Sequence, residues 1–330
     1  MFRSSNALPV QIITCDIAEF TVRARHRLSL AVALQAAVEK DQLSLEFQPQ
    51  VTTNDGTLVG FEALLRWELP GEGRIPPVEF IPLAERTGII NQIDAWVLHE
   101  ACRQAQQWNR AGHQFGRIAV NVSRLELRAK DYADQVRRTL QRTELPPELL
   151  EIEATESALV EHLDSVATNL NELRSLGITV EVDDFGTGYS SLSPLVGLPV
   201  DRLKIDGSFI SPLPEAEDSG AVVTAIVALA RALGLEVLAE CVETSDQAVF
   251  LQHNPATLPR DTCTRVHCRP EQLPHTSKRG RRSRRFDRPR LSVVLGGLTW
   301  VNKPLLGSRR VFCWCHDCST SAGSLGGVHR

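Results

Sequence analysis

The stretch HLDSVATNLNELRSLGITVEVDDFG, residues 162–186, joins a helix pattern to a strand pattern and decides the fold class. Its first half places apolar residues at helical spacing, and Gly177 ends the predicted helix. Its second half, ITVEVDDFG, is an extended run that ends in two adjacent aspartates. A helix that leads directly into a strand is typical of the parallel sheets of α/β proteins.

The same alternation of helix and strand continues in both directions. A hairpin turn, NDG at 54–56, precedes the second strand and predicts one antiparallel pairing. The pattern indicates a TIM-type (β/α)8-like barrel with one antiparallel strand. A doubly wound open sheet is the alternative, but no glycine-rich phosphate fingerprint follows the first strand. The predicted strands cover residues 43–51, 57–67, 117–123, 149–157, 178–186, 202–209 and 235–243.

Composition divides the chain at about residue 252. The first 252 residues carry a net charge of −15, and residues 253–330 carry +11 together with five of the eight cysteines. Three cysteines in the long first part do not make a disulfide framework and indicate a reducing compartment. We find no signal peptide and no apolar run of membrane-spanning length, so we expect a cytoplasmic protein without a membrane segment.

Charged and polar side chains fall within or at the ends of the predicted strands. Strands buried on both faces should be almost continuously apolar, so acids placed there need a compensating partner. In a barrel the carboxyl ends of the strands meet on one face, where active sites lie. Each acid alone could instead be a salt-bridged strand end. The set is Glu62, Asn121, Glu153, Glu156, Asp183, Asp184, Lys204, Asp206, Glu240 and Glu243.

An oxygen-rich group without cysteine or histidine favours Mg²⁺ or Mn²⁺. The acids suffice for two ions, the arrangement that assists phosphodiester hydrolysis. Lys204, a cation among acids, could orient or deprotonate a water molecule or neutralise developing charge. The glycine-rich loop DDFGTGYSS, which starts at Asp183, would allow close approach of a ligand.

Seven motifs along the chain resemble those of one protein family in order and spacing: EALLRW, FIPLAERTG, VNVS, EATES, VDDFGTGYSSL, LPVDRLKIDGSF and AECVE. The chain is similar to the EAL domain, a family of bacterial phosphodiesterases that linearise cyclic di-GMP to pGpG. The resemblance covers roughly residues 30–252. It implies a TIM-type barrel and a homodimer that binds cyclic di-GMP.

The resemblance also implies a role for each matching residue. Glu62, Asn121, Glu153 and Asp183 would hold one metal ion, and Asp183 would bridge to a second ion, with Asp184 and Glu240 nearby. Lys204 would contact the nucleophilic water, so Lys204 and Glu240 form the expected catalytic pair. Gln48 and Arg66 would contact the dinucleotide. Glu156 would anchor the DFGTGYSS loop, which in the family couples the site to dimerisation, and Glu243 would support it.

Three residues of this chain depart from the family pattern. Phe47 replaces a usual tyrosine, Ala154 interrupts the usual E-I-T-E, and Cys241 replaces the glycine of AEGVE. The side chain of Cys241 lies next to Glu240, where backbone room matters, and is expected to impair the site.

Beyond Gln252 the expected closing strand, roughly G-C-D-x-x-Q-G-Y-L-F-S-R-P-L-P, is replaced by HNPATLPRDTCTRVHCRP. Codons permitted for residues 259–269, read in a shifted frame, allow QGYLYSRPLP. We therefore expect a frameshift just after Gln252, an incomplete last strand and a disordered basic tail over 253–330.

Two other interpretations of the tail stay open. The run RGRRSRR, residues 279–285, is typical of a patch for nucleic acid or another anionic surface. The segment CWCHDC offers zinc ligands at Cys313, Cys315, His316 and Cys318, but its spacing lacks a clean second pair. With a frameshift, neither would have a role, and no specific nucleic acid is expected as a partner.

Three segments follow from these observations: a connector over 1–29, an EAL domain over 30–252 and the tail over 253–330. The connector resembles the helix that follows a GGDEF domain in tandem GGDEF–EAL proteins. The expected activity is metal-dependent hydrolysis of cyclic di-GMP, impaired by loss of the final barrel strand. The alternative is a non-catalytic module that binds cyclic di-GMP or a protein partner.

Overall fold

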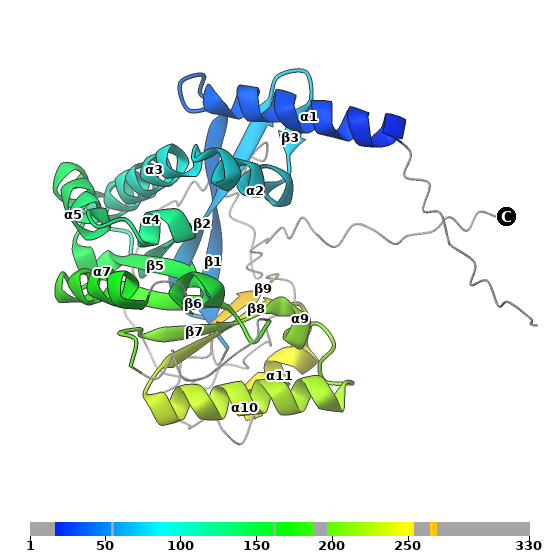
Figure 1. Cartoon of the computed structure of the whole chain (residues 1–330). Helices are drawn as coiled ribbons and strands as arrows, with labels where there is room; N and C mark the ends of the chain where they lie inside the picture. The colour runs from blue at the N-terminus through cyan, green and yellow to red at the C-terminus, as the bar shows by residue number, and fades with distance from the viewer. Residues whose placement is uncertain (1–16, 54–55, 161–162, 188–196, 254–264, 269–330) are drawn as a thin grey trace, which may run out of the picture.

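The computed structural model describes residues 17–53, 56–160, 163–187, 197–253 and 265–268. Figure 1 shows one sheet that curves into a barrel with helices on its outer face. The strands are β1 (Leu43–Thr52), β2 (Leu58–Leu69), β3 (Gly73–Ile75), β4 (Arg117–Asn121), β5 (Leu150–Thr155), β6 (Thr179–Phe185), β7 (Arg202–Ile205), β8 (Glu236–Val242) and β9 (Arg265–Cys268).

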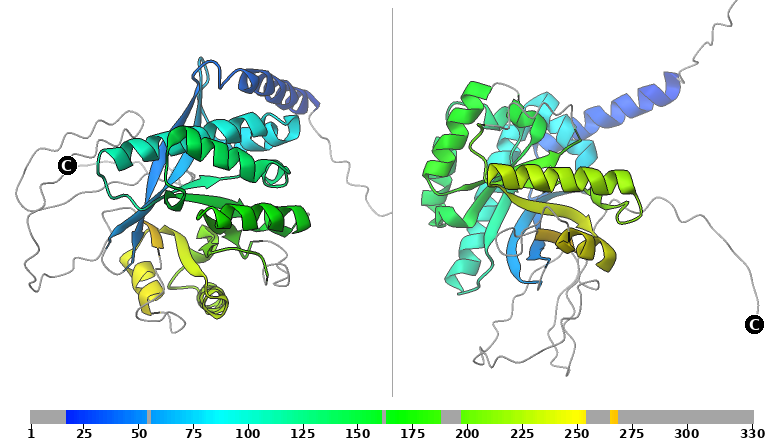
Figure 2. Two further views of the ribbon diagram at one scale, coloured as in Figure 1. Left: turned by 90° about the vertical axis from the view of Figure 1, so that its left-hand side faces the viewer. Right: turned by 90° about the horizontal axis from the view of Figure 1, so that it is seen from below.

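Helices connect consecutive parallel strands, and Figure 2 shows them lying outside the sheet in two further views. The helix α1 extends away from the barrel at one end of the molecule (Figures 1 and 2). The helices are α1 (Ile17–Gln35), α2 (Pro77–Thr87), α3 (Ile90–Arg110), α4 (Arg124–Leu127), α5 (Tyr132–Thr143), η1 (Pro147–Leu149), α6 (Glu156–Val160), α7 (Leu163–Ser175), α9 (Gly207–Ile210), α10 (Glu217–Leu233) and α11 (Ser245–His253).

The strand order confirms the predicted fold class. Strands β2, β4, β5, β6, β7 and β8 pair in parallel in that order, whereas β1 runs antiparallel to β2. The register of the hairpin places Gln48 opposite Glu62, on neighbouring strands of the barrel wall. The antiparallel strand predicted from the NDG turn is β1, and the short β3 also runs antiparallel to β2.

The last strand is the thinnest part of the barrel. β9 has four residues and bridges β8 and β1, but it forms only two registered pairs with β1, Val51 with Val266 and Thr52 with Arg265. This short strand confirms the expectation of an incomplete last strand, and the disordered tail over 253–330 stays a prediction.

Apolar packing between the strands and the outer helices fixes the wall of the barrel. Trp108 of α3 contacts Phe47 and Phe61, at ring-centroid distances of 4.9 and 5.2 Å. Phe47, one of the departures from the family pattern, is therefore part of the packed wall. Gly116 lies directly before β4 with φ 77°, and a Cβ there would lie 1.8 Å from the carbonyl oxygen of Val59. This approach requires glycine.

Candidate active site

Lys204 of β7 is the centre of a ring of carboxylates at the carboxyl ends of the strands. Its side chain is buried, with a relative exposure of 1%, and its Nζ lies 3.3 Å from carboxylate oxygens of Glu62, Glu153 and Asp183. The same Nζ lies 2.7 Å from Oε1 of Glu240. Four strands, β2, β5, β6 and β8, therefore each supply an acid to one lysine of a fifth strand.

These contacts keep Lys204 charged. Burial alone would lower its pKa, but the four surrounding carboxylates raise the pKa well above the usual lysine value. A lysine held as an ammonium ion can donate hydrogen bonds and neutralise negative charge, but it cannot accept a proton from water. Of the roles predicted for Lys204, charge neutralisation and orientation are the ones that this metal-free environment favours.

Two carboxylate oxygens of the ring differ in their hydrogen bonding. Asn121, at the end of β4, donates from Nδ2 to Oε1 of Glu62 at 2.9 Å. The fully buried Glu153 keeps one carboxylate oxygen, Oε1, without a hydrogen-bond partner among the described residues. A buried carboxylate oxygen without a donor is costly, and a metal ion is one group that satisfies it.

A second group of acids lies beside the ring. Asp183, Asp184 and Glu240 each place a carboxylate oxygen within 4.8 Å of the others, an arrangement that fits a metal ion. Five carboxylates, those of Glu62, Glu153 and these three residues, thus lie at or beside one ammonium group. The formal charge of this group is four negative, which two divalent cations would balance.

The electrostatics of the acids agree with a site built for cations. Burial, followed by repulsion from neighbouring carboxylates, raises the pKa of Glu153 well above its usual range. Burial also raises the pKa of Asp183, and it raises the pKa of the more exposed Asp184 to about 6, with repulsion from Asp183 as the next cause. Protons and divalent cations would therefore compete for these oxygens.

The predicted substrate-binding residues lie on the β1–β2 hairpin. Gln48 is half-buried opposite Glu62, which places it beside the carboxylate ring. Arg66, four residues beyond Glu62 on β2, donates from Nε to Oε2 of Glu46 at 2.8 Å. Glu46 also pairs with Arg74, so two arginines share one carboxylate near the rim. The sequence prediction did not include Glu46 or Arg74.

The two residues expected to anchor the loop after β6 have different surroundings. Glu156, which begins α6 instead of ending a strand, accepts a hydrogen bond through Oε2 from the backbone N–H of Gly186 at 3.1 Å. Glu243 follows β8, and its backbone N–H donates to Oε1 of Gln247 at 2.7 Å. The central part of the loop, residues 188–196, lies outside the described residues, as does the predicted dimer contact.

A protein-family model described as the EAL domain matches residues 31–258. The chain belongs to the EAL domain family. The resemblance carried by the motifs is therefore confirmed, and the matched segment includes every residue of the carboxylate ring.

Known relatives extend well beyond this domain. The chain is 47% identical over 228 residues to the bifunctional diguanylate cyclase/cyclic di-GMP phosphodiesterase MucR of Pseudomonas aeruginosa, covering 69% of this chain and 33% of MucR. It is 42% identical over 240 residues to the cyclic di-GMP phosphodiesterase NbdA of the same species, covering 73% of this chain and 31% of NbdA. The chain thus spans about a third of the length of these relatives.

Solved EAL domains share the architecture. The structure described as PaMucR phosphodiesterase in a c-di-GMP complex is 44% identical, with a TM-score of 0.67, covering 72% of this chain and 94% of that one. An EAL domain protein from Listeria monocytogenes is 26% identical, with a TM-score of 0.61, covering 72% of this chain and 90% of that one. Both comparisons support the EAL fold.

The interior of the EAL domain contains a second charged layer that the sequence prediction missed. Arg202 is fully buried and pairs with Glu151, with Glu181 at 3.3 Å and with Glu236 at 2.8 Å. The signal was present as alternation, because Glu151, Glu181 and Arg202 each precede a ring residue by two positions on the same strand. Positions two apart share a strand face, so one layer of charge lies beneath the other.

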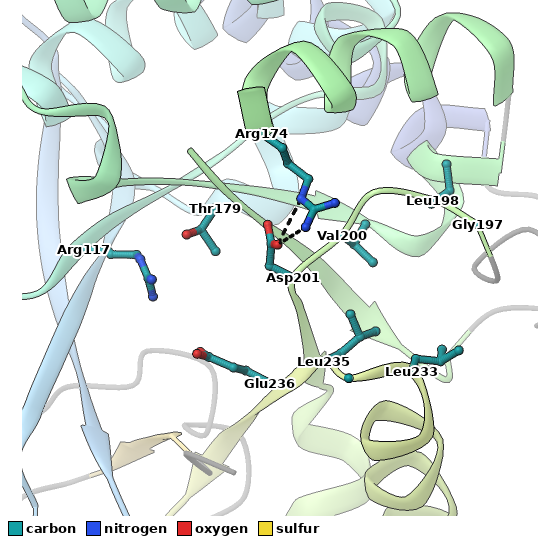
Figure 3. A pocket seen from close by; sticks show the side chains of 11 residues that line it. Arg117, Arg174, Thr179, Gly197, Leu198, Val200, Asp201, Leu233, Leu235 and Glu236 are labelled. Atoms are coloured by element: carbon teal, nitrogen blue, oxygen red, sulfur yellow. Dashed lines mark hydrogen bonds and ion pairs between the residues drawn. The ribbon is translucent and has the colours of Figure 1, made fainter. Parts of the chain in front are cut away.

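A cavity of about 530 Å³ lies at the opposite, amino ends of the strands. Figure 3 shows Arg117 and Glu236 on its walls, and Arg174 beside Asp201, with which it pairs at 2.8 Å. The carboxylate ring does not line this cavity. The Arg202 layer separates this cavity from the acidic group at the carboxyl ends of the strands.

Among the described residues, no helix has the length and hydrophobicity needed to cross a lipid bilayer.

Proposed function

We propose that this chain is a phosphodiesterase that hydrolyses cyclic di-GMP to linear pGpG with Mg²⁺ or Mn²⁺. The observation that supports the proposal most is the ring of four acids around Lys204 with Asp184 beside it, a group with a formal charge of four negative. Hard oxygen ligands without soft donors favour these ions. Relatives with this activity in their names add support from the family.

Each residue of the candidate site has a defined role in the proposed reaction. Glu62, Asn121, Glu153, Asp183 and Asp184 would hold two cations, which when bound supply Lewis-acid chemistry at the phosphoryl group. Lys204, protonated and held by four carboxylates, stabilises the negative charge that grows on the phosphoryl oxygens. Glu240 holds the Lys204 ammonium group at 2.7 Å and completes the acidic group.

The dinucleotide would lie along the hairpin beside the ring. Gln48, opposite Glu62, offers an amide to a base or a phosphate. Arg66 would contact a phosphate after exchanging part of its contact with Glu46. Glu156 holds the start of the loop after β6, which we assign to coupling between the site and a homodimer, with Glu243 in a supporting position.

A non-catalytic module that binds cyclic di-GMP is the second candidate function. The short β9, with two registered pairs to β1, favours a barrel wall that opens beside Gln48 and reduces turnover. We attribute the short pairing between β9 and β1 to a frameshift after Gln252. We also assign the segment before residue 30 to the connector of a tandem GGDEF–EAL protein. The cytoplasm, where cysteines stay reduced, is the proposed compartment.

The experiment that tests the function is a hydrolysis assay on the purified chain. Cyclic di-GMP should be converted to pGpG in Mg²⁺ or Mn²⁺, and conversion should stop when a chelator removes the metal. Glu62→Ala should lower the rate by at least ~100-fold, because it removes a ligand and a partner of Lys204. Glu172→Ala, at an exposed position of α7, is the matched control and should keep the activity.

Two results would contradict hydrolysis by this chain. Binding of cyclic di-GMP without turnover in either metal would favour the non-catalytic module. Equal rates for Glu62→Ala and the unchanged chain would place the chemistry elsewhere.

A further inference from the structure

Two strands of the barrel carry the same irregularity at the acidic group. The pairing of β6 with β7 shifts register between Val182 and Phe185, and that of β8 with β9 shifts between Ala239 and Val242. Each interval contains acids of the group, Asp183 with Asp184 in β6 and Glu240 in β8. Bulges of this kind redirect side chains, and here they turn three carboxylates toward one another.

Each bulge contains one residue in the left-handed backbone region. Asp184 has φ 54° and Cys241 has φ 52°. Aspartate tolerates this region better than most residues, because its short polar side chain forms local hydrogen bonds. Cysteine is not among the residues that favour this region, and its Cβ meets the steric cost that glycine avoids. Cys241 is therefore the residue of the two that opposes the bulge it occupies.

The side chain of Cys241 also covers Gly207. A Cβ added to Gly207 would lie 2.7 Å from the Sγ and 2.9 Å from the Cβ of Cys241, which are the near neighbours of that position. Gly207 begins α9 directly after Asp206, at the end of the strand that carries Lys204. The bulge of β8 is thus packed against the turn that follows β7.

We infer that Cys241 is a positioning residue that weakens divalent-cation binding by disfavouring the turn that brings Glu240 to Asp183 and Asp184. The carboxylates repel one another without a cation, so a bulge with a disfavoured φ can relax toward extended backbone. A cation must then draw Glu240 back toward Asp183 and Asp184. The apparent affinity for the cation therefore falls as fewer chains hold the bulged conformation. This inference rests on the cation site of the proposed function, and it does not require hydrolysis.

A series of substitutions at position 241 separates backbone conformation from sulfur chemistry. Mn²⁺ binding is measured by the electron paramagnetic resonance signal of the free ion, well below the unfolding temperature. Cys241→Gly and Cys241→Asn should bind Mn²⁺ about fivefold more tightly, because glycine and asparagine accept a positive φ. Cys241→Ala keeps the Cβ and its steric cost, so its affinity should match that of the unchanged chain.

Substitution of Gly207 gives an independent test of the contact. Gly207→Ala should weaken Mn²⁺ binding in the unchanged chain, because the new methyl group would meet the sulfur and Cβ of Cys241. Combined with Cys241→Gly, the same substitution should have an effect smaller by about threefold or more, since the two positions are in contact.

The outcomes distinguish this inference from the proposed activity. Equal affinities across the series, an equal gain for Cys241→Ala and Cys241→Gly, or no Mn²⁺ binding by any chain would overturn the role of Cys241. The predicted order of affinities without hydrolysis would support the role of Cys241 and contradict the phosphodiesterase. Hydrolysis of cyclic di-GMP with equal Mn²⁺ affinities across the series would support the phosphodiesterase and contradict the role of Cys241.

Discussion

Asp94 of α3 shows how far one buried carboxylate can depart from its usual titration. Its Oδ2 accepts a hydrogen bond from the backbone N–H of Ser123 at 3.1 Å, two residues after Asn121. Burial raises the pKa of Asp94 to about 7, although the bonds from Ser123 oppose the increase. In the unfolded chain the same group titrates near 3.8. The folded protein therefore binds more protons than the unfolded protein between these values.

This difference gives a prediction for stability against pH. The cost of burying the Asp94 charge is absent below about pH 4 and complete above about pH 7, so stability should fall as pH rises through this window. Asp94→Asn keeps an acceptor for Ser123 without the charge. Its melting temperature should match that of the unchanged chain near pH 4 and exceed it increasingly toward pH 7.

Thermal unfolding of both chains over pH 4–8 provides the measurement. Other acids with a raised pKa, such as Glu153, produce the same trend in both chains, so only the difference between them reports on Asp94. A constant difference across the range would show that Asp94 does not titrate there.

At the scale of an element, β7 carries two buried cations at positions two apart. Arg202 contacts Glu151, Glu181 and Glu236, whereas Lys204 contacts the four acids of the ring. Both lie on one face of a four-residue strand, and both compensate carboxylates that would otherwise be buried without a partner. The strand is thus an electrostatic support for its neighbours.

Replacement of each cation by methionine should distinguish the two layers. Arg202→Met and Lys204→Met should each lower the free energy of unfolding by roughly 3–5 kcal/mol in metal-free buffer, because each leaves several buried carboxylates uncompensated. Mn²⁺ should restore stability to Lys204→Met, since Asp184 and Glu240 leave that group partly exposed to solvent. It should stabilise Arg202→Met no more than it stabilises the unchanged chain, because the cation site at the ring is the same in both.

Denaturant unfolding with and without Mn²⁺ measures both effects. Equal restoration of the two variants would contradict a cation site confined to the upper layer. The absence of any loss of stability would mean that the carboxylates bind protons in place of the missing cation.

The elements also show what the sequence could predict. Strands and helices followed from apolar periodicity, and the acids at strand ends predicted the ring because parallel strands end on one face. Glu156 was assigned to a strand, but it begins α6, because element boundaries depend on local hydrogen bonds such as the one from Gly186. The Arg202 layer did not follow from the strand ends, because its residues lie two positions earlier on the same strands.

At the scale of the whole molecule, the carboxylate ring lies at one end of the barrel, and a second charged layer around Arg202 lies in its interior. The ring of pairings is thinnest at β9, which confirms the incomplete last strand expected from the sequence after Gln252. The connector boundary expected at residue 29 falls inside α1, which continues from Ile17 to Gln35. The assignment of the longer protein's domains stays a prediction.

The most direct measurement is the number of Mn²⁺ ions bound per chain, titrated by the resonance signal of the free ion. Four carboxylates around one ammonium group, with Asp184 beside them, predict about two ions. Asp183→Asn should abolish at least one, and the exposed control Asp164→Asn should leave both. Retention of two ions by Asp183→Asn, or no Mn²⁺ bound by the unchanged chain, would contradict a two-cation site at this ring.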